Sequence, residues 1–371
     1  MTHLGNKSVL NIGFEPMTTI PSGVRRYSRE LIRALKSSAA ERNSSLIESA
    51  VSKSLHAVTA RAWAAGFGGN FAHIPAGATL HATSLLAPPR TRFPLAVTIH
   101  DLVAFTHPET LTKHGARWHQ RMTLNAVSSS DAVVVPTEAI SRQLIDLFAN
   151  RAPGLADRVH VVGGAPTLLT DTEHGSTLDE SHDAANSRPY LIFVGTVEPR
   201  KGLDMLLPAM TTHADLDLVI VGAAGWGSLN LRHMIRAVNG PLGWSPDRIR
   251  ITGPLADDEL ARLMQGAEAL VLPSRAEGFG LPILEAMSLG TPVIHSSDPA
   301  LVEVAGGAAV SFMLHEDNRD STSALSDAIT QALENREALV AGGRIRSRQF
   351  SWEASAQRVW DIHTSLRNSS R

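Results

Sequence analysis

Short apolar runs alternate with helical patterns along the chain, and this alternation limits the fold more than any other feature. In the first half, the runs predicted as strands are 8–14, 95–100, 132–136 and 158–164, and the patterns predicted as helices are 22–38, 110–130 and 137–150. Thr137 is a suitable capping residue at the start of the third helix. Near-continuous apolar strands separated by helices are typical of a parallel sheet covered on both faces.

A second alternating set follows a polar, aperiodic stretch at 166–189, which we expect to be a linker. Its predicted strands are 190–195, 216–222, 248–253, 269–274 and 292–296. A chain of 371 residues is too long for one ordinary core. The sequence therefore predicts two doubly wound α/β domains, with a ligand site in a cleft at the carboxyl ends of their strands.

Composition narrows the cellular setting. The chain has no cysteine, which excludes disulfides and thiolate metal sites and fits a reducing compartment. No stretch reaches the roughly 18 consecutive apolar residues of a membrane span, and we expect no signal peptide at the N-terminus. The predicted location is the cytoplasm, including the inner face of the membrane.

Charge is distributed unevenly along the chain. Residues 1–166 carry 17 Lys and Arg against 10 Asp and Glu, whereas residues 167–371 carry 17 against 26. Solvated surfaces alone can produce such a difference. The alternative is that the basic first half faces an acidic partner, such as phosphates or an anionic membrane surface.

The stretch RAEGFGLPILEA places Glu277 on a loop and Glu285 about one turn into a helix that we expect to begin near Leu281. Pro282 suits a first helical position, and the helix N-terminus can bind a phosphate. The two carboxylates could each accept hydrogen bonds from hydroxyls, one from a ribose and one from a hexose. The structural alternative is a helix-dipole acid and a solvated loop charge.

A second strand-end loop carries adjacent Arg200 and Lys201 in FVGTVEPRKGLDMLL. An arginine fork beside a lysine point charge suits a diphosphate. A solvated basic turn is the alternative, but two strand-end loops of this kind in one domain favour a ligand site.

The two stretches GTVEPRKGLDMLLPA and PSRAEGFGLPILEAMSLGTPVI together resemble the retaining nucleotide-sugar glycosyltransferases of family 4, which have the GT-B fold. PSGVRRYSREL at 21–31, TIHDLVAFTHPE at 98–109 and VVVPTEAISRQL at 133–144 extend the resemblance over nearly the whole chain. The form HDL…HPE is most similar to bacterial mannosyltransferases of polysaccharide assembly. Nothing in 30–95 aligns with a family motif, so the acceptor is not indicated.

The resemblance implies a division into domains. Residues 1–166, joined by a C-terminal helix at 353–371, would form an acceptor-side Rossmann-like domain. Residues 167–188 would be the linker, and 189–352 the Rossmann-like domain that binds the nucleotide sugar.

The resemblance also implies a set of site residues. Catalytic roles would belong to His100, Arg200, Lys201 and Glu277. Donor-binding residues would be Gly23, Gly195, Glu198, Gly278, Phe279, Gly280, Leu281 and Glu285. Arg25, Arg26, Tyr27 and Asp101 would lie on the acceptor side. Within this set, Arg200 and Lys201 would bind the diphosphate, Glu277 the transferred sugar and Glu285 the ribose.

The implied activity is transfer of a hexose, with mannose from GDP-mannose favoured, to a glycan or lipid-linked acceptor with retention at the anomeric carbon. No metal or other cofactor would be required and no nucleic acid would be bound. The alternatives are a UDP-sugar-dependent glucosyl- or N-acetylglucosaminyltransferase, a sugar-nucleotide epimerase, or a non-catalytic sugar-nucleotide-binding protein.

Three other patterns are not expected to be sites. Asp215 and Asp217 form an Asp-x-Asp match, but at the amino end of a strand, away from the expected ligand edge. His100, His107, His114 and His119 do not have a recognisable metal-ligand spacing. GAAGWG at 222–227 lacks the G-x-G-x-x-G order of a dinucleotide site.

Overall fold

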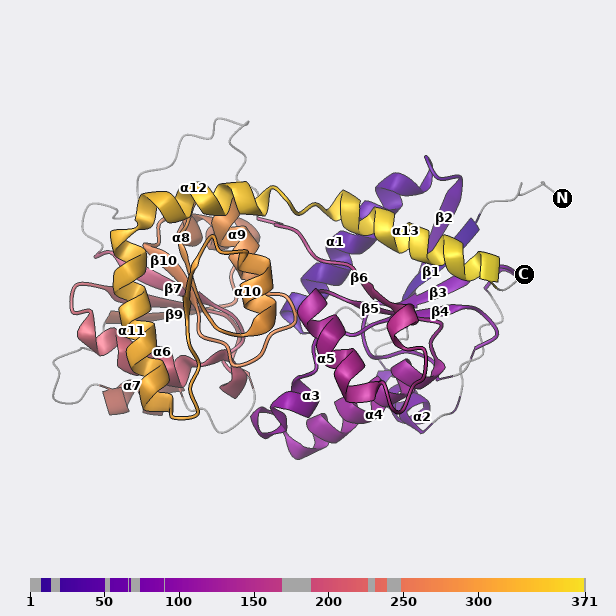
Figure 1. The fold of residues 1–371 in the computed structure, drawn as a ribbon, viewed down its shortest axis with the longest axis horizontal. Helices are drawn as coiled ribbons and strands as arrows, with labels where there is room; N and C mark the ends of the chain where they lie inside the picture. The colour runs from indigo at the N-terminus through magenta and orange to yellow at the C-terminus, as the bar shows by residue number, and fades with distance from the viewer. Residues whose placement is uncertain are drawn as a thin grey trace. The chain divides into compact units, whose positions relative to one another are not determined.

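The computed structural model describes residues 8–14, 21–50, 54–65, 67, 74–89, 91–168, 188–225, 231–238 and 248–369. These residues form two compact units (Figure 1). The first comprises 1–108, 113–164 and 350–371, and the second comprises 109–112 and 165–349. Most of the expected linker, 169–187, lies outside the described residues.

The first unit is built on a parallel sheet of six strands in the order β2-β1-β3-β4-β5-β6. The strands are β1 (Ser8–Phe14), β2 (Ser44–Ala50), β3 (Thr79–Ala82), β4 (Leu95–Thr98), β5 (Ala132–Val135) and β6 (Val159–Val161). β2 and β3 were not expected from the sequence. β2 is a polar edge strand, and β3 is only four residues long, so neither has a clear apolar pattern.

Helices cover this sheet. They are α1 (Ser22–Ala39), α2 (His56–Ala64), α3 (Val103–Thr106), α4 (Lys113–Ser129), α5 (Glu138–Phe148) and α13 (Trp352–Ser369), with short 3₁₀ turns at Pro108–Thr110 and Ala156–Arg158. Residues of α2, α4 and α5 share one core with β3, β4 and β5. α13 packs along α1 and contacts β3 (Figure 1). Thr137 caps α5 by accepting from Ile140 N, as predicted.

The second unit has its own parallel six-stranded sheet in the order β12-β11-β10-β7-β8-β9. The strands are β7 (Tyr190–Val194), β8 (Asp217–Val221), β9 (Ile249–Gly253), β10 (Ala269–Leu272), β11 (Val293–Ser296) and β12 (Val310–Phe312). β12 was not among the expected strands. The two parallel sheets, each with helices packed against it, confirm the predicted doubly wound α/β architecture.

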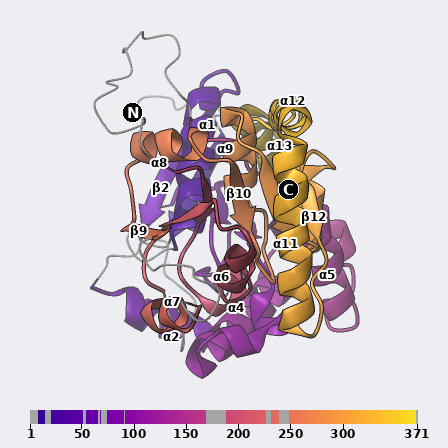
Figure 2. The same cartoon turned by 90° about the vertical axis from the view of Figure 1, so that its left-hand side faces the viewer.

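Helices of the second unit are α6 (Leu203–Ala209), α7 (Leu231–Val238), α8 (Asp257–Gln265), α9 (Leu281–Leu289), α10 (Pro299–Ala305), α11 (Asn318–Glu334) and α12 (Arg336–Ser347), with 3₁₀ turns at Pro199–Lys201 and Met210–Thr212. Residues of α6, α7 and α11 share a core with one face of the sheet. α11 lies along the edge strand β12 (Figure 2). Among the described residues, no helix is long and apolar enough to cross a membrane.

Candidate active site

The candidate site of the second unit is built on two neighbouring strands. β7 and β10 are paired in parallel, with Ala269 opposite Leu191, so their carboxyl ends lie at the same sheet edge. The loop after β7 carries the 3₁₀ turn Pro199–Lys201, and the loop after β10 carries 273–280. The topology therefore brings together two loops that are more than 70 residues apart in sequence.

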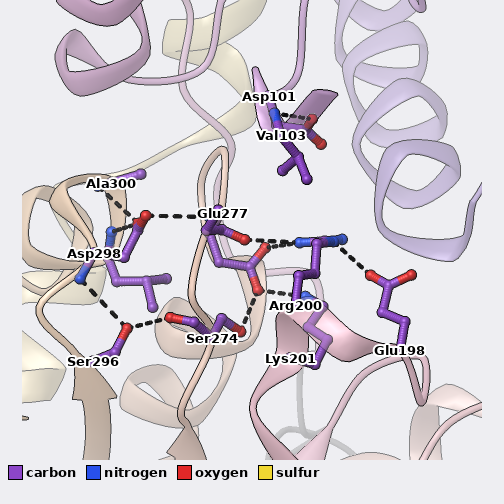
Figure 3. Close-up of polar contacts among 12 residues, drawn as sticks. Asp101, Val103, Glu198, Arg200, Lys201, Ser274, Glu277, Ser296, Asp298 and Ala300 are labelled. Carbon is purple, nitrogen blue, oxygen red and sulfur yellow. Dashed lines mark hydrogen bonds and ion pairs between the residues drawn. The ribbon is translucent and has the colours of Figure 1, made fainter. Parts of the chain in front are cut away.

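A four-residue charge cluster joins these loops, and we define it as Glu198, Arg200, Lys201 and Glu277 (Figure 3). Arg200 Nη1 lies 3.0 Å from Glu277 Oε2, and Arg200 Nε lies 2.6 Å from Glu198 Oε1. Lys201 Nζ binds Glu277 Oε1, which also accepts a 2.7 Å hydrogen bond from Ser274 Oγ. The cluster contains two cations and two carboxylates, so it is electrically neutral when all four are ionised.

Gly202 allows the two loops to approach closely. Its φ of +72° lies in the left-handed region, which favours glycine. A Cβ at this position would lie only 1.9 Å from the Pro273 carbonyl oxygen. A side chain at residue 202 would therefore push the basic turn away from the loop that carries Glu277.

Burial and pairing set the ionisation of the cluster. Burial would raise the pKa of Glu277, but Lys201 and Arg200 outweigh it and hold that pKa at about 2. Burial lowers the pKa of Lys201, and the neighbouring Arg200 charge lowers it further, against the opposing effect of Glu277. Glu277 is therefore a carboxylate at neutral pH, bound by two cations that a phosphate would also attract.

Arg275 ties the same loops together from outside the charge cluster. Its guanidinium forms a bidentate pair with Asp204 at 2.9 and 2.7 Å and donates to the Pro199 carbonyl at 3.1 Å. Its backbone N–H donates to the Arg200 carbonyl at 2.7 Å. Asn318 completes the contact by bonding to both Arg275 and Asp204. Arg275 is the first residue of the stretch RAEGFGLPILEA, but the sequence analysis assigned it no role.

Glu198, predicted to bind the donor, pairs with Arg200 in the structure. Its side chain is 1% exposed and is the counter-ion of Arg200. Gly195 directly follows β7, and its N–H donates to the Val221 carbonyl. Glu198 therefore holds the Arg200 side chain, and the donor-binding roles of Glu198 and Gly195 stay predictions.

The second glutamate of the motif lies in α9, which begins at Leu281 as predicted. Gly280 precedes it with a φ of +88°, and a Cβ there would lie 2.6 Å from Leu301. Glu285 is 2% exposed and its Oε1 accepts a 2.5 Å hydrogen bond from Thr167 Oγ1. Gly278 and the side chains of Phe279 and Leu281 are buried in this turn. The structure therefore places Glu285 in a buried position, on the helix that follows the Glu277 loop.

His100 is the catalytic residue expected in the first unit. Its Nε2 lies 2.8 Å from the Thr83 carbonyl oxygen. A carbonyl only accepts, so Nε2 carries the proton and Nδ1 has the lone pair. Burial lowers the pKa of His100 despite the Thr83 carbonyl and the nearby Asp101 charge, which favours the neutral ring.

Tyr27, predicted to lie on the acceptor side, is buried. The side chain is 2% exposed, and its hydroxyl donates to the Val162 carbonyl at 2.8 Å. Its ring meets the His100 ring edge-on at 5.0 Å and the Trp352 ring at 5.4 Å. Tyr27 is therefore a packing residue that fixes the imidazole and the start of α13, and burial raises the pKa of its phenol.

The neighbours of Tyr27 on α1 remain accessible. Gly23 and Arg25 are exposed in the first turn and Arg26 is half-buried. No atom lies within 4 Å of a Cβ built at Gly23, so the fold of this unit does not require glycine there. Asp101 accepts from Val103 N at 3.2 Å and stabilises the start of α3 (Figure 3).

The Asp-x-Asp match and the histidines of the first unit are the two patterns considered as metal ligands. Asp217 begins β8 at its amino end, as predicted, and its Oδ1 lies 3.1 Å from Arg248 Nε. Among the residues that the structure describes, no group of three or more His, Asp or Glu side chains is placed to hold a metal ion.

Comparison with known proteins places these observations in a family. The family described as "Glycosyl transferases group 1" matches residues 175–344. The O-antigen chain mannosyltransferase B of Escherichia coli is 32% identical over 264 residues, covering 69% of this chain and 66% of that protein. A D-inositol 3-phosphate glycosyltransferase of Streptosporangium roseum is 33% identical over 251 residues, covering 64% of this chain and 55% of that protein. The chain thus spans less than two thirds of the length of these relatives.

Solved structures show the same fold. Sucrose-phosphate synthase from Thermosynechococcus elongatus aligns with a TM-score of 0.74 at 18% identity, covering 98% of this chain and all of that one. WaaG, described as a glycosyltransferase involved in lipopolysaccharide biosynthesis, aligns with a TM-score of 0.64 at 15% identity, covering 96% and 99%. These likenesses confirm the predicted GT-B fold.

Proposed function

We propose, since this chain belongs to the group 1 glycosyl transferases, that it transfers a hexose from a nucleoside diphosphate sugar to a glycan or lipid-linked acceptor. The observation that carries the proposal is the charge cluster at the carboxyl ends of β7 and β10. Two adjacent cations there share one carboxylate, Glu277, within a site of low exposure. A diphosphate and a sugar hydroxyl are the ligands that this combination of charges would bind.

In the proposed reaction, the bond between the anomeric carbon and the phosphate oxygen breaks, and a bond to the acceptor oxygen forms on the same face of the sugar. Negative charge grows on the leaving diphosphate, where Arg200 and Lys201 stabilise it. The acceptor proton passes to a leaving phosphate oxygen, so no strong side-chain base is needed. Glu277 contacts the transferred sugar and Glu285 the ribose.

We favour mannose from GDP-mannose as the donor. Its support is the 32% identity to a protein named as a mannosyltransferase. A thermal-shift panel of GDP, UDP, GDP-mannose and UDP-glucose tests this, because a ligand that binds the folded chain raises its melting temperature. A shift with GDP-mannose and none with UDP-glucose would support the proposal. The reverse result would replace the donor, and no shift with any of the four would remove the nucleotide-sugar assignment.

We also propose that the reaction needs no metal, with the two cations of the charge cluster taking the place of one. Turnover should then continue in EDTA. Complete loss of turnover in EDTA, restored by added Mg²⁺ or Mn²⁺, would contradict this part of the proposal.

The acceptor is proposed to be acidic or lipid-linked, and the location to be the cytoplasm at the inner membrane face. The exposed side of α1 carries Arg25, Arg29, Arg33 and Lys36, against which Glu30 and Glu48 form ion pairs, and the remaining excess of positive charge supports an anionic partner. Binding to vesicles that contain anionic lipid should fall as salt rises, because salt screens surface charge. Equal binding to neutral vesicles would count against it.

A further inference from the structure

The peptide group between Ala276 and Glu277 is held from both sides. On its carbonyl side, the Ala276 oxygen accepts a 3.0 Å hydrogen bond from Arg200 Nη1. On its amide side, the Glu277 N–H donates to Asp298 Oδ2 at 3.3 Å. Figure 3 shows Arg200 and Asp298 on opposite sides of Glu277. The orientation of this peptide plane sets the direction in which the Glu277 side chain leaves the backbone.

Asp298 is held in place by elements outside the charge cluster. It follows β11, which pairs in parallel with β10, so residues after both strands meet. The Ser296 hydroxyl donates to the Ser274 carbonyl at 2.5 Å, and the Asp298 N–H donates to the Ser296 oxygen at 3.4 Å. Asp298 Oδ1 caps α10 by accepting from Ala300 N at 3.0 Å and Leu301 N at 3.1 Å.

Aspartate is a common capping residue, but capping α10 does not by itself require a buried charge. Asp298 is 8% exposed, and burial together with the Glu277 charge raises its pKa to about 6, so keeping a carboxylate here is costly. Serine or asparagine would cap α10 about as well without a charge. Neither would present a second acceptor oxygen to the Glu277 N–H. The second carboxylate oxygen therefore has a purpose beyond the cap.

We infer that Asp298 is a positioning residue for Glu277: its second carboxylate oxygen orients the peptide that directs the Glu277 side chain toward the donor sugar. The inference rests on the proposed function, because it assigns Glu277 to the reacting sugar. Asp298 itself touches neither sugar nor nucleotide in this account. It acts through the backbone, while Arg200 fixes the other end of the same peptide group.

Two variants separate positioning from capping. Asp298→Asn keeps the capping oxygen but turns an amide N–H₂ toward the Glu277 N–H. Asp298→Ser keeps a capping hydroxyl and has no second oxygen. The matched control is Asp317→Asn in the same unit, because Asp317 caps α11 by accepting from Arg319 N at 2.8 Å and lies outside the charge cluster.

The first measurement is hydrogen–deuterium exchange by mass spectrometry on the full chain. In both Asp298 variants, peptides that contain the Glu277 amide should exchange several-fold faster, whereas peptides from α10 should keep wild-type rates. Asp317→Asn should leave the Glu277 region unchanged. Unchanged exchange at Glu277 in both Asp298 variants would overturn the inference, whether or not the chain transfers sugar.

The second measurement is turnover of GDP-mannose and UDP-glucose, followed as released nucleoside diphosphate, together with calorimetry of the free GDP and UDP. A misdirected Glu277 should reduce kcat roughly tenfold to a hundredfold. Affinity for the free nucleotide, which lacks the transferred hexose, should stay within about twofold. Equal loss of kcat and nucleotide affinity would overturn the inference in favour of a general structural role. A wild-type chain that binds no nucleotide would instead refute the proposed function, and the exchange result would still decide the role of Asp298.

Discussion

Arg200 Nη1 makes two hydrogen bonds at Glu277: it lies 3.0 Å from the side-chain oxygen Glu277 Oε2 and 3.0 Å from the Ala276 carbonyl oxygen, which belongs to the peptide group that precedes Glu277. Lys201 binds the other carboxylate oxygen. Without ligand, Glu277 is thus the anion that these cations bind. A donor diphosphate competes with it for the same charges.

Glu277→Gln should therefore bind free nucleoside diphosphate more tightly than the wild type while losing turnover. Removing the carboxylate charge leaves the two cations Arg200 and Lys201 with the single carboxylate of Glu198, and this net positive charge strengthens their attraction for a phosphate. We expect roughly a three- to tenfold gain in GDP or UDP affinity by calorimetry and a fall in kcat of tenfold or more.

The control for this variant is Glu334→Gln, an exposed position near the end of α11. It removes the same charge from the same unit and should change neither quantity. Weaker nucleotide binding in Glu277→Gln would show that the carboxylate organises the cations instead of competing for them.

Sequence reasoning located the charge cluster because each of its loops follows an apolar strand, and parallel strands end at a common edge. It missed Asp298 and Arg275 because their partners lie far away in sequence. Asp298 contacts an amide 21 residues away, and Arg275 contacts Asp204, 71 residues away. Locally, Asp298 followed by Pro299 is indistinguishable from an ordinary helix start.

The burial of Tyr27 was not anticipated from its position in the motif. Tyr27 was grouped with Arg25 and Arg26 because the three are adjacent, but two residues correspond to about 200° around a helix. Arg25 accordingly faces solvent while Tyr27 is buried. The apolar residues of α1 identify its buried face, so the burial of Tyr27 could have been predicted from their periodicity. The hydrogen bond from Tyr27 to the Val162 carbonyl could not have been predicted.

Gly202→Ala should destabilise the chain by more than backbone conformation alone explains. The substitution forces a left-handed φ of +72° on alanine, which costs about 1–2 kcal/mol, and drives its Cβ into the Pro273 oxygen. Gly307→Ala is the control, because its φ is +79° and no atom lies within 4 Å of a Cβ built there. Thermal unfolding should show a larger loss for Gly202→Ala, with weaker nucleotide binding. Equal losses would mean that the loops can separate without cost.

The Arg275–Asp204 pair should show energetic coupling. Its two hydrogen bonds and partial burial distinguish it from an isolated surface pair. A double-mutant cycle with Arg275→Gln and Asp204→Asn, read by denaturant unfolding, should give about 1 kcal/mol of coupling. Additive effects would show that the pair contributes no net stability.

Tyr27→Phe should lower stability without a matching loss of turnover. The change leaves the buried Val162 carbonyl without the phenol donor, which costs about 1–2 kcal/mol, but preserves the ring against His100 and Trp352. Melting temperature and kcat on the same preparations test this. A large fall in kcat with unchanged melting temperature would restore Tyr27 to a direct role.

The carboxylates of Glu277 and Asp298 should make the stability of the fold depend on pH with opposite signs. The pKa of Glu277 falls from 4.5 to about 2 on folding, so its contribution to stability is present above pH 4.5 and is lost as the pH falls toward 2. The pKa of Asp298 rises from 3.8 to about 6, so its contribution is present below pH 3.8 and is lost as the pH rises through 6.

Melting temperatures of wild type, Glu277→Gln and Asp298→Asn between pH 3 and pH 8 separate the two contributions. Relative to wild type, Glu277→Gln should recover a few degrees below about pH 4.5, whereas Asp298→Asn should gain a few degrees between about pH 4 and pH 7. Parallel curves for all three proteins would show that neither carboxylate changes its proton affinity on folding.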